Sequence, residues 1–279
     1  MASIGERARL TVLRESSPGL FLDSEGDLGE VLLPGREIPP DWKKGDALDV
    51  FLYRDSEDIP VATLRHPKAM PGEFACLECV SVTGFGAFLD WGLPKDLFVS
   101  FREQKERLAP AKSYVVYVYV DAETDRIAAT CRLSRHLSKE HPPYQDGEEV
   151  ELLIHARTDL GYKAIVNSEH TGVIFANQVF RHLRIGEKTK GYVTQVRHDG
   201  KIDRALDPPG RKRIEDLEIR IEAELRRRGG FWHLCDSSPP EEIKRNLGVS
   251  KKAFKQATGA LFRKRKITIE KDGIRAVAP

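Results

Sequence analysis

The chain has 279 residues, 40% of them hydrophobic and 32% charged, so it is too long for one small domain and too apolar for a disordered chain. Its longest apolar run, residues 114–120, is far shorter than the roughly 20 residues that span a bilayer, and its first residues lack a signal-peptide pattern. The four cysteines are too few and too irregularly spaced for a secreted disulfide framework. Composition therefore excludes membrane-spanning and disulfide-stapled classes, and predicts a soluble cytoplasmic protein with no membrane partner.

The net charge of +2 conceals a difference between the two ends of the chain. Residues 208–279 hold 18 Lys and Arg against 10 Asp and Glu, whereas residues 1–207 hold 27 against 33. A basic C-terminal segment on an otherwise acidic chain indicates a surface that faces nucleic acid. The alternative is a solvated helical surface whose charge serves solubility.

An internal repeat is visible in the first 207 residues. Residues 18–23 read PGLFLD, residues 85–90 read FGAFLD, and a weaker third copy at residues 160–166 reads LGYKAIV. All three copies share the glycine at the second position. A glycine inside an early strand is typical of a bend or bulge, and a small closed barrel needs such corners.

Further strand-like segments recur in the same order after each glycine. An alternating run follows it, at residues 47–53, 114–120 and 189–196. A short last strand then closes each copy, at residues 61–65, 128–132 and 202–206. Five short strands in units of about 60 to 65 residues predict small OB-type barrels. The expected fold class is mainly β with a C-terminal α+β domain, and the three tandem five-stranded barrels are expected at residues 1–66, 67–140 and 141–207.

The second copy carries a specific resemblance. Residues 85–90, 96–100, 119–121 and 126–130 resemble the RNA-binding domain that is repeated in ribosomal protein S-one. The first and third copies are divergent. Three such copies followed by a helical tail are similar to the conserved virulence factor B family of bacteria, and this resemblance covers nearly the whole chain. It implies an RNA-binding protein with a role in gene regulation.

The same resemblance implies that Phe85 and Phe88 lie on the barrel face that meets RNA. Single strands bind by stacking their bases on aromatic rings while cations track the phosphates. Phe98 is a further candidate, although its apolar strand favours a place in the core, and a core position is the alternative for the other two rings as well. The expected phosphate contacts are Lys95, Arg102 and Arg132. Because the other copies lack the pair of phenylalanines, only the second barrel has a complete stacking pair.

Beyond the barrels the pattern changes to that of helices. The first predicted helix ends at residues 229–230 (GG), the second runs from residues 238–239 (SP) to Gly248, and the third begins after Ser250 as its cap. Residues 267–277 then contain two short apolar segments around an Asp-Gly turn, which predicts a hairpin. Three helices followed by a hairpin are typical of a winged helix-turn-helix.

This winged-helix domain, residues 208–279, carries its positive charge on the third helix and the turn after it. Between Ser250 and Ile269 there are seven basic residues and no acidic one. Helices that serve only solubility usually mix the two signs, so the pattern favours an anionic ligand. The predicted contacts with nucleic acid are Lys251, Lys252, Lys255, Arg263, Lys264, Arg265 and Lys266.

The leading hypothesis is a non-enzymatic RNA-binding regulatory or accessory protein that holds single-stranded RNA on the second barrel and the basic domain together. A DNA-binding transcriptional regulator is the first alternative, with duplex nucleic acid as its partner. A nuclease or other nucleic-acid enzyme is the second, but it would need clustered carboxylates or histidines. Cys76 and Cys79 have the spacing of half a zinc site without a second pair. No catalytic residue, metal or cofactor is therefore expected.

Overall fold

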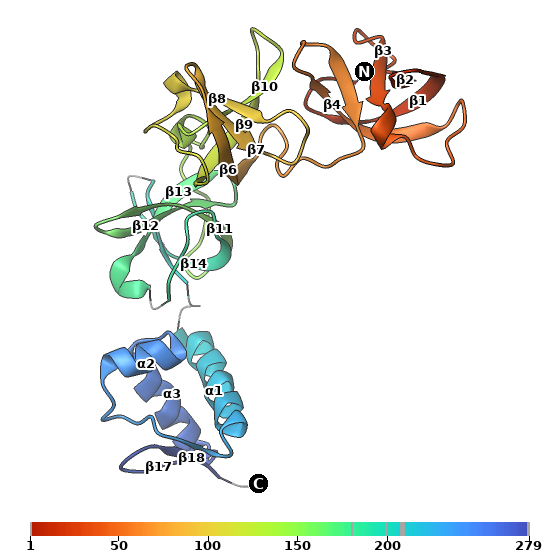
Figure 1. The fold of residues 1–279 in the computed structure, drawn as a ribbon. Helices are drawn as coiled ribbons and strands as arrows, with labels where there is room; N and C mark the ends of the chain where they lie inside the picture. Colours follow the sequence, from red (N-terminus) through yellow and green to blue (C-terminus); the bar gives the residue numbers. More distant parts are fainter. Residues whose placement is uncertain (1, 180, 199, 207–209, 278–279) are drawn as a thin grey trace. The chain divides into compact units, whose positions relative to one another are not determined.

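The computed structural model describes residues 2–179, 181–198, 200–206 and 210–277. Along the chain it contains three β-barrels and then a helical domain (Figure 1). Residues 1–137 and residues 138–279 form two compact units. The predicted mainly β class with three five-stranded barrels is confirmed. The predicted boundary at residues 207–208 lies outside the described residues.

Each barrel closes five strands, and in each the third and fifth strands pair in parallel. Barrel 1 consists of β1 (Arg7–Ser16), β2 (Gly19–Asp23), β3 (Glu30–Pro34), β4 (Ala47–Arg54) and β5 (Pro60–Thr63). Barrel 2 consists of β6 (Phe74–Val82), β7 (Gly86–Asp90), β8 (Leu97–Ser100), β9 (Ser113–Asp121) and β10 (Arg126–Thr130). Barrel 3 consists of β11 (Glu149–Thr158), β12 (Gly161–Val166), β13 (His170–Phe175), β14 (Lys188–Val196) and β15 (Ile202–Ala205). A 3-10 turn follows the third strand of each barrel, at η1 (Gly35–Glu37), η2 (Phe101–Glu103) and η4 (Ala176–Gln178).

The glycine of the repeat begins the second strand of every barrel. A Cβ atom on Gly19, Gly86 or Gly161 would lie 2.0, 2.4 or 2.1 Å from a carbonyl oxygen of the third strand. The bulge expected at this glycine lies instead in the preceding strand, where the register shifts between Cys79 and Ser81 in barrel 2 and at the matching place in barrels 1 and 3. The glycine is therefore required by the close approach of two strands.

Barrels 1 and 2 pack against each other within the first unit. Phe51 and Tyr53 on β4 are buried in the same apolar cluster as Trp91, and the Phe51 and Trp91 rings meet edge to face at 5.9 Å. The Lys95 ammonium donates to the carbonyl oxygens of residues 54–55, at 3.0 and 2.5 Å. Apolar burial and buried hydrogen bonds thus join these two barrels into one body.

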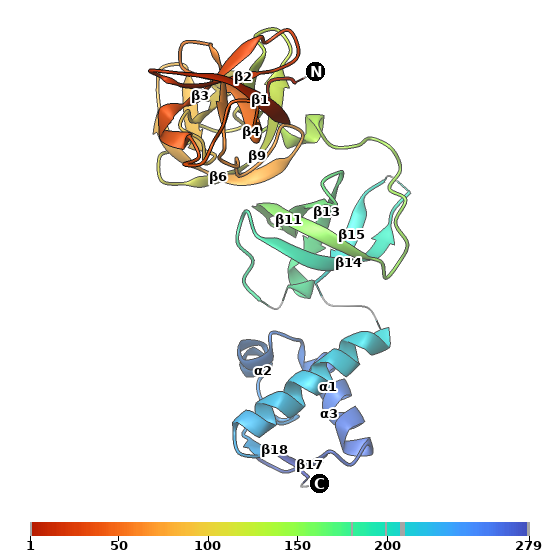
Figure 2. The same ribbon diagram turned by 90° about the vertical axis from the view of Figure 1, so that its right-hand side faces the viewer.

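The C-terminal domain contains three helices and a small sheet, with α1 and α3 side by side (Figure 2). Its elements are α1 (Gly210–Arg227), β16 (Phe231–Trp232), α2 (Pro240–Leu247), α3 (Lys251–Arg263), β17 (Ile267–Ile269) and β18 (Ile274–Ala276). The hairpin β17–β18 is the predicted wing. Strand β16 adds a third strand beside β18 that the sequence pattern did not predict. The predicted winged-helix fold is confirmed.

Two helix starts in this domain differ in their caps. The Ser250 hydroxyl accepts a hydrogen bond from the Ala253 amide at 3.2 Å, as predicted. At α2, however, the cap position is Pro239 without a side-chain bond, and Ser238 accepts from the Cys235 amide instead. A proline at the helix start already fixes the backbone angle that the first turn needs, so α2 begins without a serine cap.

Candidate nucleic-acid interface

Barrel 2 carries a row of cross-strand partners on its outer surface. Alternate residues of these strands, such as Ala87 and Val99, are fully buried in the barrel, so their neighbours Phe88 and Phe98 face outward. Directly paired residues share a face, which lets the row be followed from strand to strand through the register. We call these five residues the outer row of barrel 2: Ser81, Phe88, Phe98, Ala128 and Tyr119.

The outer row is mostly aromatic. The Phe88 and Phe98 rings lie 5.2 Å apart at 45°, and both are half-buried. Ala128 pairs with Phe98 on one side and with Tyr119 on the other, so a single methyl group lies between those two rings. The expectation that Phe98 belongs to the core is not met, because Phe98 faces outward and its neighbour Val99 faces inward.

Phe85 lies in the turn that leads into β7, three residues before Phe88 of the row. Its side chain is 82% exposed, the largest value among the exposed apolar side chains of the described residues. Its carbonyl oxygen accepts from the Phe101 amide at 3.3 Å, which fixes the turn against η2. A fully exposed phenylalanine on a fixed backbone is costly in water and suited to stacking.

Sequence reasoning missed an aromatic group on the next strand. Tyr117 and Tyr119 project from the outer side of β9, and the His136 ring stacks on Tyr117 at 4.0 Å and 18° and lies 6.0 Å from Tyr119. Burial lowers the pKa of His136, with Glu103 acting in the opposite direction. The alternation of residues 113–121 was the available signal, because its buried valines leave the tyrosines on the opposite face.

Two of the predicted cations lie beside this row. The Thr130 hydroxyl donates to the Glu103 carboxylate at 2.5 Å and accepts from the Arg132 amide at 2.9 Å. The Arg132 guanidinium donates to the Arg102 carbonyl oxygen at 2.6 Å. Glu103 and Thr130 therefore place Arg132 next to Arg102, whose own side chain is exposed.

The third predicted cation, Lys95, does not belong to this surface. Its ammonium is half-buried against the barrel 1 carbonyl oxygens described above, and this burial lowers its pKa. A lysine whose donors are used inside an interface has little left for phosphate. The structure thus pairs Phe88 with Phe98 and Arg132 with Arg102, holds Phe85 against η2, and leaves Lys95 aside.

The corresponding rows of the other barrels differ from that of barrel 2. In barrel 1 the row ends in Tyr53 and Val61, which barrel 2 buries, while the Arg14 guanidinium lies 3.9 Å from the Phe21 ring centre. Its five members are Arg14, Phe21, Leu32, Val61 and Tyr53. In barrel 3 the row contains no aromatic residue. Its five members are Ala156, Lys163, Val173, Asp203 and Gln195.

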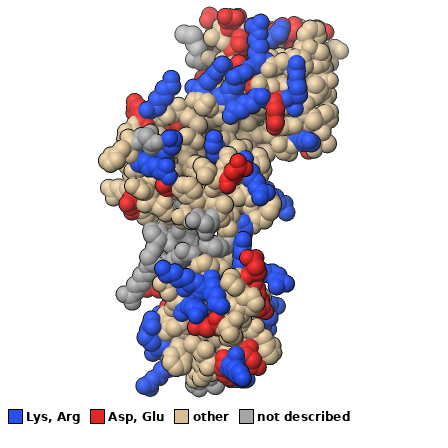
Figure 3. Space-filling view, turned by 90° about the vertical axis from the view of Figure 1, so that its left-hand side faces the viewer, with Lys and Arg blue, Asp and Glu red and all other residues tan. Residues whose placement is uncertain are grey.

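The predicted basic residues of the winged-helix domain divide into paired and unpaired groups. Lys264 and Lys266 bind Glu218 and Glu222 of α1 at 2.5 and 2.7 Å. Lys251 donates to the Ser238 carbonyl oxygen at 2.9 Å, and Lys255 lies 3.7 Å from Asp236. Lys252, Arg263 and Arg265 are exposed, and no carboxylate among the described residues pairs with them. Figure 3 shows Lys and Arg side chains grouped on this domain with carboxylates between them.

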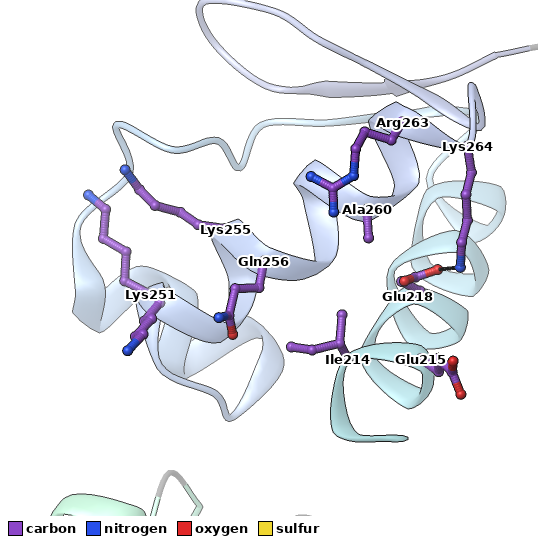
Figure 4. A pocket seen from close by; sticks show the side chains of 10 residues that line it. Ile214, Glu215, Glu218, Lys251, Lys255, Gln256, Ala260, Arg263 and Lys264 are labelled. Carbon is purple, nitrogen blue, oxygen red and sulfur yellow. Dashed lines mark hydrogen bonds and ion pairs between the residues drawn. The ribbon is translucent and has the colours of Figure 1, made fainter. Parts of the chain in front are cut away.

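A groove of about 1100 Å³ runs between α1 and α3 (Figure 4). Lys251, Lys255 and Arg263 extend from the α3 side, whereas Ile214 and Glu215 project from α1. The groove thus has one cationic wall, one acidic wall and an apolar patch between them. Phosphates are attracted to the cationic wall, which α3 provides, and are repelled by carboxylates of the wall that α1 provides.

Chemistry of other kinds finds little support in the described residues. No three His, Cys, Asp or Glu side chains gather there in a way that could hold a metal ion. Cys76 and Cys79 are half-buried and buried, and burial raises the pKa of both thiols. None of the described helices is long and apolar enough to cross a membrane.

Comparison with known sequences agrees with this architecture. The profile of the CvfB-like winged helix domain matches residues 220–275, and that of the S1 domain matches residues 4–65. The chain is 27% identical over 292 aligned positions to the uncharacterized protein YitL of Bacillus subtilis, covering 94% of this chain and 90% of the relative. It is 23% identical over 233 positions to conserved virulence factor B of Staphylococcus saprophyticus, covering 81% and 78%. The resemblance to the conserved virulence factor B family is confirmed.

The S1 profile matches barrel 1, which lacks the pair of phenylalanines found in barrel 2. A match to this domain profile therefore does not require the stacking pair. Among solved structures, a multidomain protein with nucleic acid binding domains from Streptococcus pneumoniae is 22% identical, with 98% of both chains covered and a TM-score of 0.47. The CSD456 segment of Drosophila Unr has a TM-score of 0.18 at 16% identity, covering 75% of this chain and all of that one.

Proposed function

We propose that the chain is a non-enzymatic, cytoplasmic RNA-binding protein with a regulatory or accessory role, which holds single-stranded RNA on the outer row of barrel 2 and on α3. The observation that carries this proposal is the outer row, together with the exposed Phe85 in the turn before it. Each base stacked on such a ring contributes roughly 1 to 3 kcal/mol. A duplex keeps its base faces covered, so aromatic rings in a row favour unpaired bases.

The charges of the winged-helix domain also favour a single strand. A helix that enters the major groove of a duplex has phosphates on both sides of it. On one side of α3 the carboxylates Glu218 and Glu222 neutralise the nearest lysines, and the turn of the wing carries Glu270 and Asp272. Because those lysines are already neutralised and Glu270 of the wing pairs with Arg275, few free cations remain for a second row of phosphates, whereas one strand can follow the free cations alone.

The winged-helix domain matched in the family comparison supports nucleic-acid binding but does not choose between RNA and DNA. The DNA-binding regulator therefore stays the alternative to exclude. A nuclease is less well supported, because the described residues provide no metal-binding cluster.

A panel of ligands tests the proposal on the full chain. Fluorescence anisotropy with labelled oligo(U), a hairpin RNA and duplex DNA, at two salt concentrations, should give the tightest binding to oligo(U). A preference for the duplex at both salt concentrations would replace the proposal with the DNA-binding alternative.

Matched variants then locate the site. Replacing Phe85 and Phe88 with alanine should weaken oligo(U) binding about tenfold or more, since tenfold corresponds to about 1.4 kcal/mol. The control is Leu160→Ala, because Leu160 is 67% exposed in the matching turn of barrel 3, where the row has no ring. Equal effects of the two changes would show that the outer row of barrel 2 is not the site.

A further inference from the structure

The hydrogen bonds that position Arg132 in barrel 2 recur in barrel 1. The Thr63 hydroxyl donates to the Glu37 carboxylate at 2.5 Å and accepts from the Arg65 amide at 3.1 Å. The Leu64 amide also donates to Glu37, at 2.9 Å. Glu37 follows Arg36 in η1 in the same way that Glu103 follows Arg102 in η2. Two barrels therefore share the same glutamate–threonine hydrogen bonds, which we call the lock; in barrel 2 the Arg132 guanidinium also bonds the Arg102 carbonyl oxygen, and in barrel 1 Arg65 lies beside Glu37.

Barrel 3 has the same strands without this lock. The register aligns Val61 with Asp203, which puts Ala205 at the position of Thr63. In η4 a glutamine, Gln178, takes the place of Glu37. In η4 the position of Arg36 is taken by Asn177, and in the sequence the residue two positions beyond Ala205 is Asp207. A barrel can thus form without the lock and without the arginines, so closure of the fold does not explain why barrels 1 and 2 have them.

The arginines of barrel 1 are exposed at the surface, although Arg65 also forms an ion pair with Glu37. Arg36 and Arg65 are both exposed, and no carboxylate among the described residues pairs with Arg36. Arg65 lies 3.4 Å from Glu37, with its side chain half exposed. Both guanidinium groups act on Tyr53 and oppose the effect of burial, which raises the pKa of that tyrosine. Both cations therefore act on the same tyrosine of β4, which is buried in the joint between the two barrels.

Stacking is not open to this part of barrel 1. Phe51 and Tyr53 correspond by register to Tyr117 and Tyr119 of barrel 2, and both are buried beneath residues that include Trp91. A ligand at this place can meet guanidinium groups but no ring of β4. The chemistry that remains is the recognition of phosphate, for which arginine is well suited.

The joint also fixes the two arginine pairs relative to each other. The hairpin between β4 and β5 meets the hairpin between β9 and β10 through two ion pairs, Arg54 with Asp125 at 2.7 Å and Asp58 with Arg126. Lys95 adds the buried hydrogen bonds to residues 54–55. A second site held at a constant position raises the effective concentration of a ligand already bound at the first.

We propose that Arg36 and Arg65 form a phosphate-binding site on barrel 1, which extends the RNA strand held by the outer row of barrel 2 without contacting its bases. This inference rests on the proposed function, because it concerns the same ligand. It assigns to barrel 1 a role in affinity and salt dependence and none in the choice of base.

Oligo(U) of two lengths tests this site on the full chain. One OB barrel covers roughly 4 to 16 nucleotides, so a strand of about 6 nucleotides occupies barrel 2 alone and one of about 24 reaches beyond it. Replacing Arg36 and Arg65 with alanine should weaken binding of the longer strand about tenfold and lower its salt slope by about 1.4, or about 0.7 for each phosphate contact. Binding of the shorter strand should stay within about twofold of the unchanged chain.

Two controls separate the site from charge and from folding. Lys43→Ala with Lys44→Ala removes the same charge from an exposed loop of barrel 1 and should leave the salt slope unchanged. Arg36→Lys with Arg65→Lys keeps the charge and should keep most of the slope. The thermal unfolding midpoint of each variant should match that of the unchanged chain. If the alanine variant unfolds early, Arg36→Gln with Arg65→Gln takes its place, because it removes the charge and keeps most of the side-chain length.

The outcomes distinguish this inference from the proposed function. If the unchanged chain fails to bind oligo(U) of either length, the proposed function is wrong and the inference fails with it. If the unchanged chain binds and the alanine variant keeps the full salt slope, barrel 1 is not part of the site and only the inference is overturned. An equal loss with the Lys43 and Lys44 variant would likewise overturn it, because the effect would then be one of net charge.

Discussion

Barrels 2 and 3 have the same strand order, the same glycine and the same bulge, yet their outer rows share no chemistry. Barrel 2 presents Phe88, Phe98 and Tyr119 where barrel 3 presents Lys163, Val173 and Gln195. The inward residues of both barrels are mostly small or branched apolar groups. The difference teaches that the inward face and the glycine determine the barrel, while the outward face is free to acquire or lose a ligand.

The first prediction concerns the glycine that both barrels share, because replacing it should destabilise each of them. Gly86→Ala should destabilise the first unit by about 2 to 3 kcal/mol, because the new Cβ would lie 2.4 Å from the Val99 carbonyl oxygen and the strands would have to separate. Gly161→Ala should do the same to barrel 3, where the positive φ of 139° adds strain. Urea unfolding followed by circular dichroism measures both. Gly84→Ala is the control, since a Cβ there meets nothing within 4 Å; equal midpoints for Gly84→Ala and Gly86→Ala would contradict this account.

The second prediction concerns the charges of α3. Lys252→Glu with Arg263→Glu should weaken oligo(U) binding about tenfold and lower its salt slope by about 1.4, since both side chains are exposed and unpaired among the described residues. Lys264→Glu with Lys266→Glu is matched in charge, but these lysines already bind Glu218 and Glu222. The anisotropy measurement should therefore give a smaller change for the second pair, and the reverse order would place the contact on the α1 side of the groove.

The third prediction introduces the aromatic rings of barrel 2 into barrel 3. Lys163→Phe with Val173→Phe puts rings at the barrel 3 positions of Phe88 and Phe98, on an exposed and a half-buried site. If rings in that geometry suffice, the variant should bind oligo(U) about three- to tenfold more tightly, because each stacked base contributes roughly 1 to 3 kcal/mol. Lys163→Leu with Val173→Leu keeps the apolar area without rings. Equal gains from both variants would assign the effect to apolar area rather than to stacking.

The smallest expected effect is a pH dependence of the first unit. Burial against the tyrosines lowers the pKa of His136, so the unfolded chain takes up a proton at higher pH than the folded one. The contribution of His136 to stability should be complete above the ordinary histidine pKa of about 6.5, and should decrease as the pH falls through that value toward the lowered one. Urea midpoints across this range measure the change. His136→Phe keeps a ring on Tyr117 and should remove this part of the pH dependence; an unaltered profile would show that another group titrates.

Much of the fold could be predicted from local patterns. The repeated glycine marked three barrels because only glycine tolerates the approach of the third strand, and Ser250 marked the start of α3 because its hydroxyl satisfies a free amide. These features depend on neighbours in sequence or on one recurrent contact. The position of the bulge could not be predicted, because it depends on the register between two strands.

The candidate site was predicted less completely for the same reason. Whether Phe98 or Val99 faces outward depends on the register of β8, and the sequence shows only that they face opposite sides. The sequence alone suggests that Lys95 binds phosphate, because its partners, two carbonyl oxygens of barrel 1, are distant from it in the sequence. The pairing of Lys264 was likewise not predictable, because the residues around it in the sequence are not acidic and its partner Glu218 is distant in the sequence.

Photochemical cross-linking tests the central claim most directly. Oligo(U) that carries 5-iodouracil is irradiated on the full chain, and the attached peptides are identified by mass spectrometry. The account predicts cross-links at Phe85, Phe88 and Tyr119, because stacked rings are the preferred partners of the excited base. Cross-links confined to barrel 3 or to β16 would contradict the assignment of the outer row of barrel 2 as the RNA-binding surface.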